Sequence, residues 1–150
     1  MCPAAASPST TGADHAAGRV LPANATLHSL VERQAEASPE AVAVVCGDDE
    51  LTYAALNSQA ADLARRLQSR GVRPGDLVGI SVDRGLQRIV GLLGILKAGA
   101  AYLPLDPEYP SDRLTFMLRD SQTQLLLTER RFSDRFRDAA TERLLIDDAD

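Results

Sequence analysis

The chain lacks tryptophan and holds only two cysteines and 4% aromatic residues among its 150 positions. Two cysteines, Cys2 and Cys46, cannot by themselves build a disulfide scaffold or a zinc site. The longest apolar run extends only from Ile89 to Leu96, far short of the roughly 20 residues that a membrane-spanning helix needs. These absences exclude a disulfide-rich secreted domain and a membrane protein, and they favour a reducing, cytoplasmic home.

Basic residues are also fewer than acidic residues. Lys and Arg number 16 against 21 Asp and Glu, which gives a net charge of −5. Nucleic-acid binding is driven by clustered positive charge, so this balance argues against it. Hydrophobic residues make up 45% and charged residues 25%, values typical of soluble globular proteins. The length suits one domain with a real core and is too short for two.

Residues 1–25 are mostly Ala, Pro, Ser, Thr and Gly, with almost no large apolar side chains. Burial could not offset the backbone entropy lost on ordering such a segment, so we predict a disordered leader. It has neither the basic start nor the apolar core of a signal peptide. Met1 is expected to be a true start, with no condensation domain before it.

From residue 26 to residue 150, helical and extended patterns alternate. Apolar residues at helical spacing predict helices at Thr26–Ser38, around Leu56–Leu67, at Leu86–Ala98, from Ser111, and at Arg130–Ala140. Apolar runs predict strands at Ala41–Cys46, Leu77–Val82, Ala101–Leu105, Leu125–Thr128 and Leu144–Asp147, with a brief extended piece at Leu51–Tyr53. This alternation predicts an α/β fold, a mostly parallel sheet with helices on both faces. The chain stops just after a strand, which indicates an incomplete subdomain.

Familiar cofactor motifs are absent. Neither a dinucleotide fingerprint nor a P-loop is present. Gly91 and Gly94 lie inside an apolar helix, where small residues more often permit close packing than bind phosphate. His15 falls in the leader and His28 on the first helix, and neither has a partner at ligand or triad spacing.

Charged and nucleophilic residues have ordinary structural interpretations. Asp48, Asp49 and Glu50 are expected to form a solvated turn. For Asp147, Asp148 and Asp150, a frayed terminus is favoured over a Mg²⁺ site. Cys46 is expected to be a buried structural thiol, and Lys97 to complement the negative end of its helix. A solvated helix face is expected for the alternating charges, which are Arg130, Arg131, Asp134, Arg135, Arg137 and Asp138.

Two segments carry a resemblance to a known family. They are LTYAALN at Leu51–Asn57 and LLGILKAGAAYLPLDPEYP at Leu92–Pro110, the second followed by SDRLTFMLRDS and LLLT. Together with LHSLVERQAEASPEAVAVV and GVRPGDLVGISVDR, they resemble the opening part of adenylation domains of nonribosomal peptide synthetases, in the adenylate-forming superfamily. The resemblance covers residues 26–128, in the family's order. One departure is Gly85, where the family usually has serine.

The physical roles of the second segment are those of a scaffold. Gly99 can take the left-handed turn that ends a buried helix, and Tyr102, Leu103 and Leu105 are expected to fill the sheet. The resemblance implies that residues 26–150 are the amino-terminal portion of an adenylation domain. It further implies an enzyme that uses MgATP to form an aminoacyl-adenylate and then loads the phosphopantetheine thiol of a carrier domain.

In the family, the phosphate-binding loop, the aspartate that holds the substrate amino group and a late lysine all lie further along. We therefore assign no catalytic, cofactor-binding or metal-binding residue within 1–150, and expect this segment alone to be inactive. The rest of the domain is expected to cover the sheet. Two alternatives stay open: a short non-catalytic interaction module that keeps the fold, and part of an acyl-CoA ligase-like relative.

Overall fold

The computed structural model describes residues 25–148. The leader predicted for residues 1–25 therefore lies outside the described residues, except for its last position. The first helix, α1 (Leu27–Ala37), begins where predicted because Thr26 caps it: its side chain accepts a hydrogen bond from the Ser29 N–H at 3.4 Å, and Ser29 Oγ accepts one from the Thr26 N–H at 3.0 Å. Among the described helices, none is long and apolar enough to cross a membrane.

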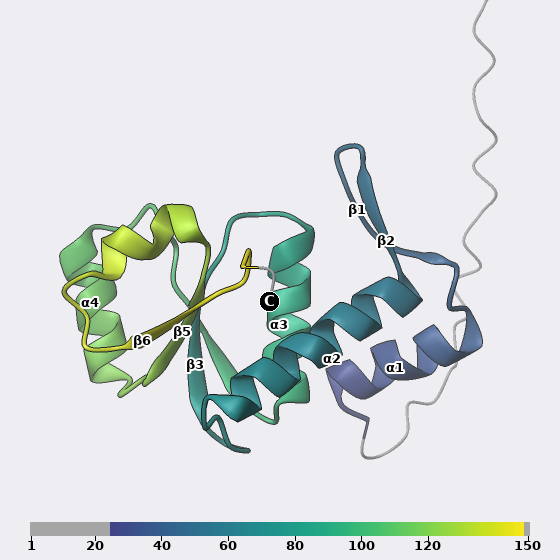
Figure 1. Cartoon of the computed structure of the whole chain (residues 1–150), viewed down its shortest axis with the longest axis horizontal. Coiled ribbons are helices and arrows are strands. Elements are labelled where there is room, and N and C mark those ends of the chain that lie inside the picture. The colour runs from purple at the N-terminus through teal and green to yellow at the C-terminus, as the bar shows by residue number, and fades with distance from the viewer. Residues whose placement is uncertain (1–24, 149–150) are drawn as a thin grey trace, which may run out of the picture.

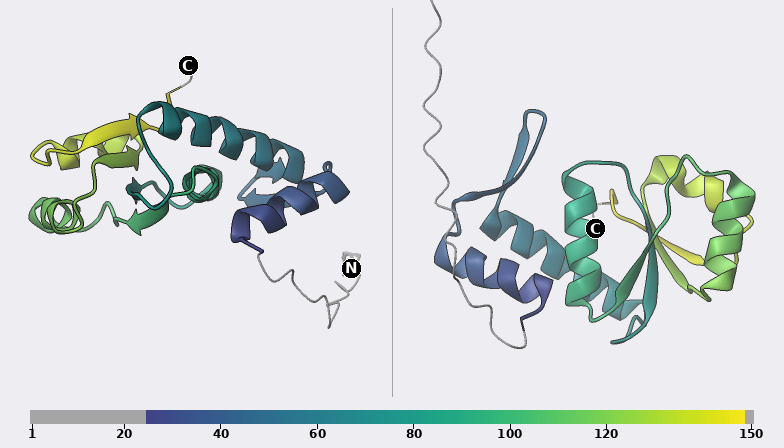
Figure 2. Two further views of the ribbon diagram at one scale, coloured as in Figure 1. Left: turned by 90° about the horizontal axis from the view of Figure 1, so that it is seen from below. Right: turned by 180° about the vertical axis from the view of Figure 1, so that it is seen from behind.

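The strand predicted at Ala41–Cys46 exists, but it lies outside the four-stranded main sheet, and its apolar run does not make it a buried strand. β1 (Val42–Cys46) pairs only with β2 (Asp49–Thr52), in an antiparallel hairpin that turns at Gly47. Val42 and Val45 are 47% and 65% exposed, and Cys46 is exposed rather than buried as expected. Figures 1 and 2 show the hairpin projecting away from the main sheet. Ala43 and Val44 are half-buried against the hydrophobic core, whereas Val42, Val45 and Cys46 face solvent.

The main sheet has four parallel strands in the order β4-β3-β5-β6 (Figure 1). They are β3 (Leu77–Ser81), β4 (Ala101–Pro104), β5 (Leu125–Thr128) and β6 (Glu142–Leu145). The parallel sheet expected from the alternating pattern is confirmed. β4 forms one edge, so Tyr102 is 42% exposed rather than filling the sheet as expected.

Helices cover both faces of this sheet, as predicted. Successive side chains of a strand point to opposite faces, so Leu125 and Leu127 join one core and Leu126 the other. The larger core lies under α2 (Tyr53–Ser69) and α3 (Leu86–Lys97), and the smaller one under α4 (Ser111–Asp120) and η1 (Arg130–Phe136).

Two glycines allow α3 to approach its neighbours closely. A Cβ on Gly94 would lie 2.7 Å from Leu63 Cδ2 on α2, and one on Gly91 would lie 2.9 Å from Ile80 Cδ1 on β3. Both distances are shorter than real Cβ contacts allow, so the packing role predicted for this glycine pair is confirmed. Gly99, with φ of +84°, ends the helix in the left-handed region as expected.

The last predicted helix is shorter and tighter than expected. In place of an α-helix at Arg130–Ala140, the chain forms the 3-10 helix η1, with i→i+3 bonds such as Phe132 N–H to Glu129 O at 3.0 Å. A 3-10 helix advances further per residue than an α-helix. Its Phe136 is nevertheless fully buried and completes the smaller core.

Candidate functional site at the carboxyl edge of the sheet

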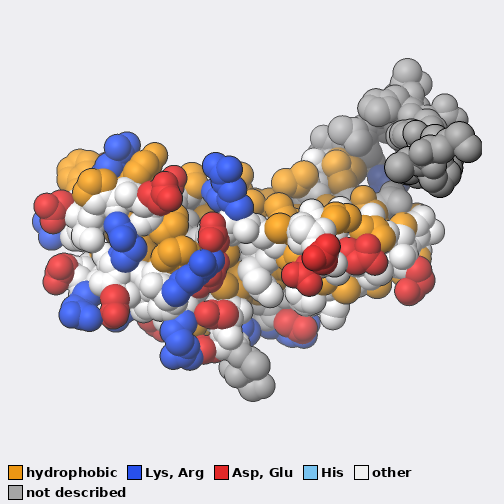
Figure 3. Space-filling model, turned by 90° about the horizontal axis from the view of Figure 1, so that it is seen from above, with side chains coloured by type: hydrophobic (Ala, Val, Ile, Leu, Met, Phe, Trp, Pro, Cys, Tyr) orange, Lys and Arg blue, Asp and Glu red, His pale blue; other side chains and the backbone are white. Residues whose placement is uncertain are grey.

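The strand order creates a switch point between β3 and β5. After β3 the chain passes to α3 on one face, and after β5 it passes to η1 on the other. Open α/β sheets bind ligands in the crevice where neighbouring connections leave in opposite directions, beyond the carboxyl ends of the strands. Figure 3 looks onto this edge and shows basic and acidic side chains interspersed over it.

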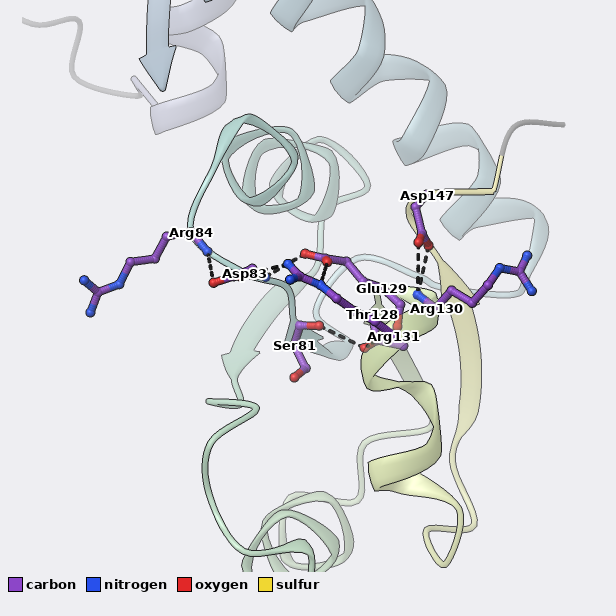
Figure 4. Close-up of polar contacts among 8 residues, drawn as sticks. All are labelled: Ser81, Asp83, Arg84, Thr128, Glu129, Arg130, Arg131 and Asp147. Atoms are coloured by element: carbon purple, nitrogen blue, oxygen red, sulfur yellow. Dashed lines mark hydrogen bonds and ion pairs between the residues drawn. The ribbon is translucent and has the colours of Figure 1, made fainter. Parts of the chain in front are cut away.

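An ion-paired bridge spans the switch point (Figure 4). Asp83, which follows β3, donates its backbone N–H to Glu129 Oε1 at 2.7 Å. Arg131 lies between the two carboxylates, with Nη2 at 2.8 Å from Asp83 Oδ2 and Nε at 2.5 Å from Glu129 Oε2. The bridge therefore connects the loops that follow two adjacent strands.

The electrostatics of the bridge follow from these contacts. The hydrogen bond from the Arg84 N–H lowers the pKa of the Asp83 carboxyl below its ordinary value of 3.8, and the Arg131 guanidinium lowers it further. The hydrogen bond to Glu129 raises the pKa of Arg131, with a further contribution from Asp83. The contacts of the bridge thus favour the charged forms of Asp83 and Arg131.

The end of β6 is tied to the same edge. The Asp147 carboxylate accepts the Arg130 N–H at 3.0 and 3.1 Å, and Asp148 forms an ion pair with the Arg130 guanidinium. The frayed terminus expected here is therefore wrong for these two aspartates, while Asp150 lies outside the described residues. In residues 25–148, no group of three or more His, Cys, Asp or Glu side chains could hold a metal ion.

Two buried hydroxyls lie just beneath the bridge. Thr128 Oγ1 donates to the Ser81 carbonyl at 2.9 Å and joins the ends of β3 and β5. The Ser81 hydroxyl is also fully buried but, among the described residues, has no hydrogen-bond partner. Figure 4 shows the Ser81 side chain turned away from the ion pairs.

Cavities flank the bridge on its two sides. One of about 670 Å³ lies between the β4–α4 loop and η1, and its charged lining residues are four arginines and three carboxylates: Arg84, Arg88, Arg131, Arg135, Asp83, Asp106 and Glu108. The other, of about 400 Å³, lies toward the hairpin, and four carboxylates are among its lining residues: Asp49, Asp83, Glu129 and Asp147. The two sides of the switch point thus differ in charge.

Several residues considered in the sequence lie away from this edge. Lys97, only 9% exposed at its side chain, forms an ion pair with Glu32 and so fastens α3 to α1. The His28 ring contacts Thr26 Oγ1 at 3.1 Å near the start of α1. Cys2 and His15 lie outside the described residues. Asp48, Asp49 and Glu50 are all exposed, as expected, but only Asp48 lies in the turn, because Asp49 and Glu50 belong to β2 and pair with β1.

The arginines around η1 do more than form the predicted solvated face. Besides the pairs of Arg130 and Arg131, Arg135 donates to the Tyr109 carbonyl at 2.9 Å, and Arg137 pairs with Asp134 at 3.1 Å. Sequence reasoning missed Asp83 and Glu129 altogether. The available signal was their place immediately after two strands of a parallel sheet, since such positions meet at one edge.

Comparison with known proteins shows which family the chain belongs to. The family model described as "AMP-binding enzyme" matches residues 31–150. The chain belongs to the AMP-binding enzyme family. Within that family, it matches the amino-terminal region of nonribosomal peptide synthetase adenylation domains, as the sequence motifs predicted.

Relatives of this AMP-binding chain include a plipastatin synthase polypeptide of Bacillus subtilis, 54% identical over 109 residues, or 73% of the chain and 4% of that protein. A solved nonribosomal peptide synthetase, FmoA3, is 37% identical with a TM-score of 0.73. The match covers 80% of the present chain and 13% of the FmoA3 chain. O-succinylbenzoate coenzyme A synthetase from Bacillus subtilis shares the fold, with a TM-score of 0.71 at 22% identity. The match covers 78% of the present chain and 31% of the synthetase chain. The chain thus spans only a small part of the relatives it matches.

Proposed function

We propose that the protein acts in nonribosomal peptide synthesis as an ATP-dependent adenylate-forming ligase that activates an amino acid. The observation that carries this proposal is the 54% identity to a peptide synthetase over 73% of the chain, together with the family match at residues 31–150. We further propose that residues 26–150 are the amino-terminal portion of the adenylation domain, that residues 1–25 are a disordered leader, and that the protein is cytoplasmic.

In the proposed reaction, a carboxylate oxygen of the amino acid attacks the α-phosphorus of ATP. A new phosphorus–oxygen bond forms, the bond to the bridging oxygen breaks, and pyrophosphate leaves with that oxygen. The phosphopantetheine thiol of a carrier domain then attacks the acyl carbon, and AMP departs. Residues 25–148 hold no cluster suited to a metal, so we assign no ligand of the Mg²⁺ of MgATP to them.

In the proposed enzyme, this region forms the carboxyl edge of the parallel sheet, and the rest of the domain supplies the catalytic residues. The Asp83–Arg131–Glu129 bridge connects the loops after β3 and β5. The two glycines of α3 set the distance between that helix and its neighbours. A preorganised edge matters because sites on rigid strands keep reacting groups in position better than sites on loose loops. We assign no catalytic residue to 1–150.

The test is amino-acid-dependent exchange of labelled pyrophosphate into ATP. A protein that carries this region within a whole adenylation domain is expected to show exchange with one or a few amino acids, whereas the 150-residue chain is expected to show none. Exchange by the 150-residue chain would contradict the scaffold role. Trapping the product with hydroxylamine separates the rival enzyme class, because an acyl-CoA ligase would yield hydroxamates from carboxylic acids that lack an amino group.

A further inference from the structure

Helix α4 presents an aromatic side chain to solvent at the end of the molecule away from the hairpin (Figures 1 and 2). Its inner side packs into the smaller core through Leu114 and Leu118, which are 0% and 1% exposed. Its outer side carries Phe116, which is 65% exposed, whereas Phe132 and Phe136 pack in or against that core. A single exposed apolar side chain is ordinary on a protein surface, but the charged residues around Phe116 form a defined pattern.

The residues around Phe116 carry charges in a self-complementary order. At about 3.6 residues per turn, Asp112 and Arg119 lie on one flank of Phe116. Arg113 and Asp120 lie on its other flank. Each flank therefore has one acidic and one basic residue at opposite ends, and the order of the two charges is reversed between the flanks. All five side chains are exposed.

Most of these charges have no partner in the part of the chain that the structure describes. Within residues 25–148, the side chains of Asp112, Arg119 and Asp120 form neither a hydrogen bond nor an ion pair. Arg119 lines a cavity together with Asp138, a carboxylate on the segment after η1, but does not pair with it. The outer side of α4 thus has charges available for a partner.

The charges match when two copies of α4 lie face to face and antiparallel. A two-fold axis that crosses both helices at Phe116 places each flank opposite the same flank of the second copy, running in the reverse direction. Asp112, about 6 Å before Phe116 along the helix, then faces Arg119 of the second copy, about 4.5 Å from its own Phe116. Arg113 faces Asp120 of the second copy in the same way. Each flank therefore forms two ion pairs beside a central contact between the two Phe116 rings.

We propose that the outer side of α4 binds a second copy of this chain, packed antiparallel across Phe116. The opposed dipoles of antiparallel helices add to the match between the charges. A single pair of short helices buries less than the roughly 1,200 Å² of the smallest stable interfaces. The dimer is therefore weak, with an expected Kd of about 0.1–1 mM, and it is independent of the proposed enzyme activity.

The test is sedimentation equilibrium of the 150-residue chain at concentrations up to about 1 mM, the upper end of the expected Kd. A reversible monomer–dimer equilibrium is expected, and high salt should weaken it because exposed ion pairs are screened. Phe116→Ser should raise the Kd about tenfold or more, since a central aromatic anchor is lost from both copies. Val45→Ser is the matched control and should leave the Kd unchanged, because Val45 is also 65% exposed but lies on the hairpin. A chain that stays monomeric, or an equal loss in both variants, would overturn the proposal.

Charge reversal on one flank tests the antiparallel arrangement. Asp120→Arg places a positive charge opposite Arg113 of the second copy and should raise the Kd about tenfold, although a basic residue suits the last turn of a helix. Adding Arg113→Asp recreates the pair with reversed signs and should return the Kd to near the wild-type value. It does so despite the loss of the Arg113 guanidinium from its place over the Tyr109 ring, 4.1 Å from the centroid. In a parallel pair Arg113 would face Asp112 instead, so failure of the double variant to recover would overturn the antiparallel dimer.

The carboxylate beside Arg119 provides a second control. Asp112→Asn and Asp138→Asn each remove one negative charge, but only Asp112→Asn should weaken the dimer. An equal loss in Asp138→Asn would overturn the assignment of the interface to the outer side of α4. Circular dichroism confirms that each variant is folded, and concentration-dependent amide chemical shifts at residues 112–120 locate the contact independently of any variant.

Discussion

β5 and β1 have similar sequences, LLLT and VAVVC, and opposite surroundings. Every residue of β5 is buried, whereas Val42, Val45 and Cys46 of β1 are exposed. β5 lies between β3 and β6 and is covered by helices on both faces, while β1 has one partner strand. An apolar run thus marks a strand, but the number of neighbouring strands and layers decides whether its side chains are buried.

Truncation of one side chain in each strand gives the largest expected contrast. Leu126→Ala removes a fully buried side chain from between the sheet and α4, and we expect it to lower the free energy of unfolding by about 2–5 kcal/mol. Val45→Ala shortens an exposed hairpin residue and should change the free energy of unfolding by less than about 0.5 kcal/mol. Urea unfolding followed by circular dichroism measures both. Comparable losses would mean that the hairpin is buried as well as the sheet.

The glycine contact between α2 and α3 gives the next effect. Gly94→Ala places a methyl group against Leu63, and overpacking of this kind costs about 1–3 kcal/mol, offset by about 1 kcal/mol of improved helix propensity. We expect a net loss of stability in urea. In a Leu63→Ala background the same change should be neutral or stabilising. An equal loss in both backgrounds would show that the contact is not the cause.

The two buried hydroxyls beneath the bridge form a matched pair. Thr128→Val removes the hydrogen bond to the Ser81 carbonyl and should cost about 0.5–1.5 kcal/mol. Ser81→Ala removes a buried hydroxyl that has no partner among the described residues, so it should be neutral or stabilising. Thermal unfolding of the two variants beside the wild type makes the comparison. A larger loss in Ser81→Ala would show that this hydroxyl does have a partner.

The smallest effect concerns the ion-paired bridge and pH. The pKa of Asp83 is lowered in the folded state, so its stabilising contribution is present above its ordinary value of 3.8 and is lost as pH falls through the lowered pKa. Because the group is exposed, the effect should be small and should weaken in high salt. The denaturation midpoint of Asp83→Asn should therefore depend less on pH than that of the wild type as the pH falls below the ordinary value of 3.8. An identical pH dependence would show that the bridge contributes nothing.

Most of the main sheet can be predicted from local pattern. The strand predicted at Leu125–Thr128 is correct to the residue, and the helix predicted at Leu86–Ala98 ends one residue earlier, at Lys97. Apolar periodicity and Gly99 are sufficient there because the determinants lie within one element. β6 is displaced by two residues, from the predicted Leu144–Asp147 to Glu142–Leu145, because its register is set by pairing with β5.

The candidate site cannot be predicted in the same way. Asp83 and Arg131 are 48 residues apart, and their contact exists only because β3 and β5 are neighbours. Charged residues in a sequence are ordinarily interpreted as solvated surface. Only the strand order shows which of them become neighbours. The same holds for Asp147, whose carboxylate accepts hydrogen bonds from the Arg130 N–H in place of the expected fraying.

Short-range spacing and contiguous motifs are enough to establish the class of fold, the position of most elements, the glycine contacts of α3 and the family, because each of these is encoded within one stretch of the chain. Folding in three dimensions is needed to make β1 part of an exposed hairpin, to tighten the last helix into a 3-10 helix, and to bring Asp83, Glu129 and Arg131 together across the switch point. These features depend on which distant segments become neighbours, and pairing between strands is a property of the whole chain rather than of any one segment.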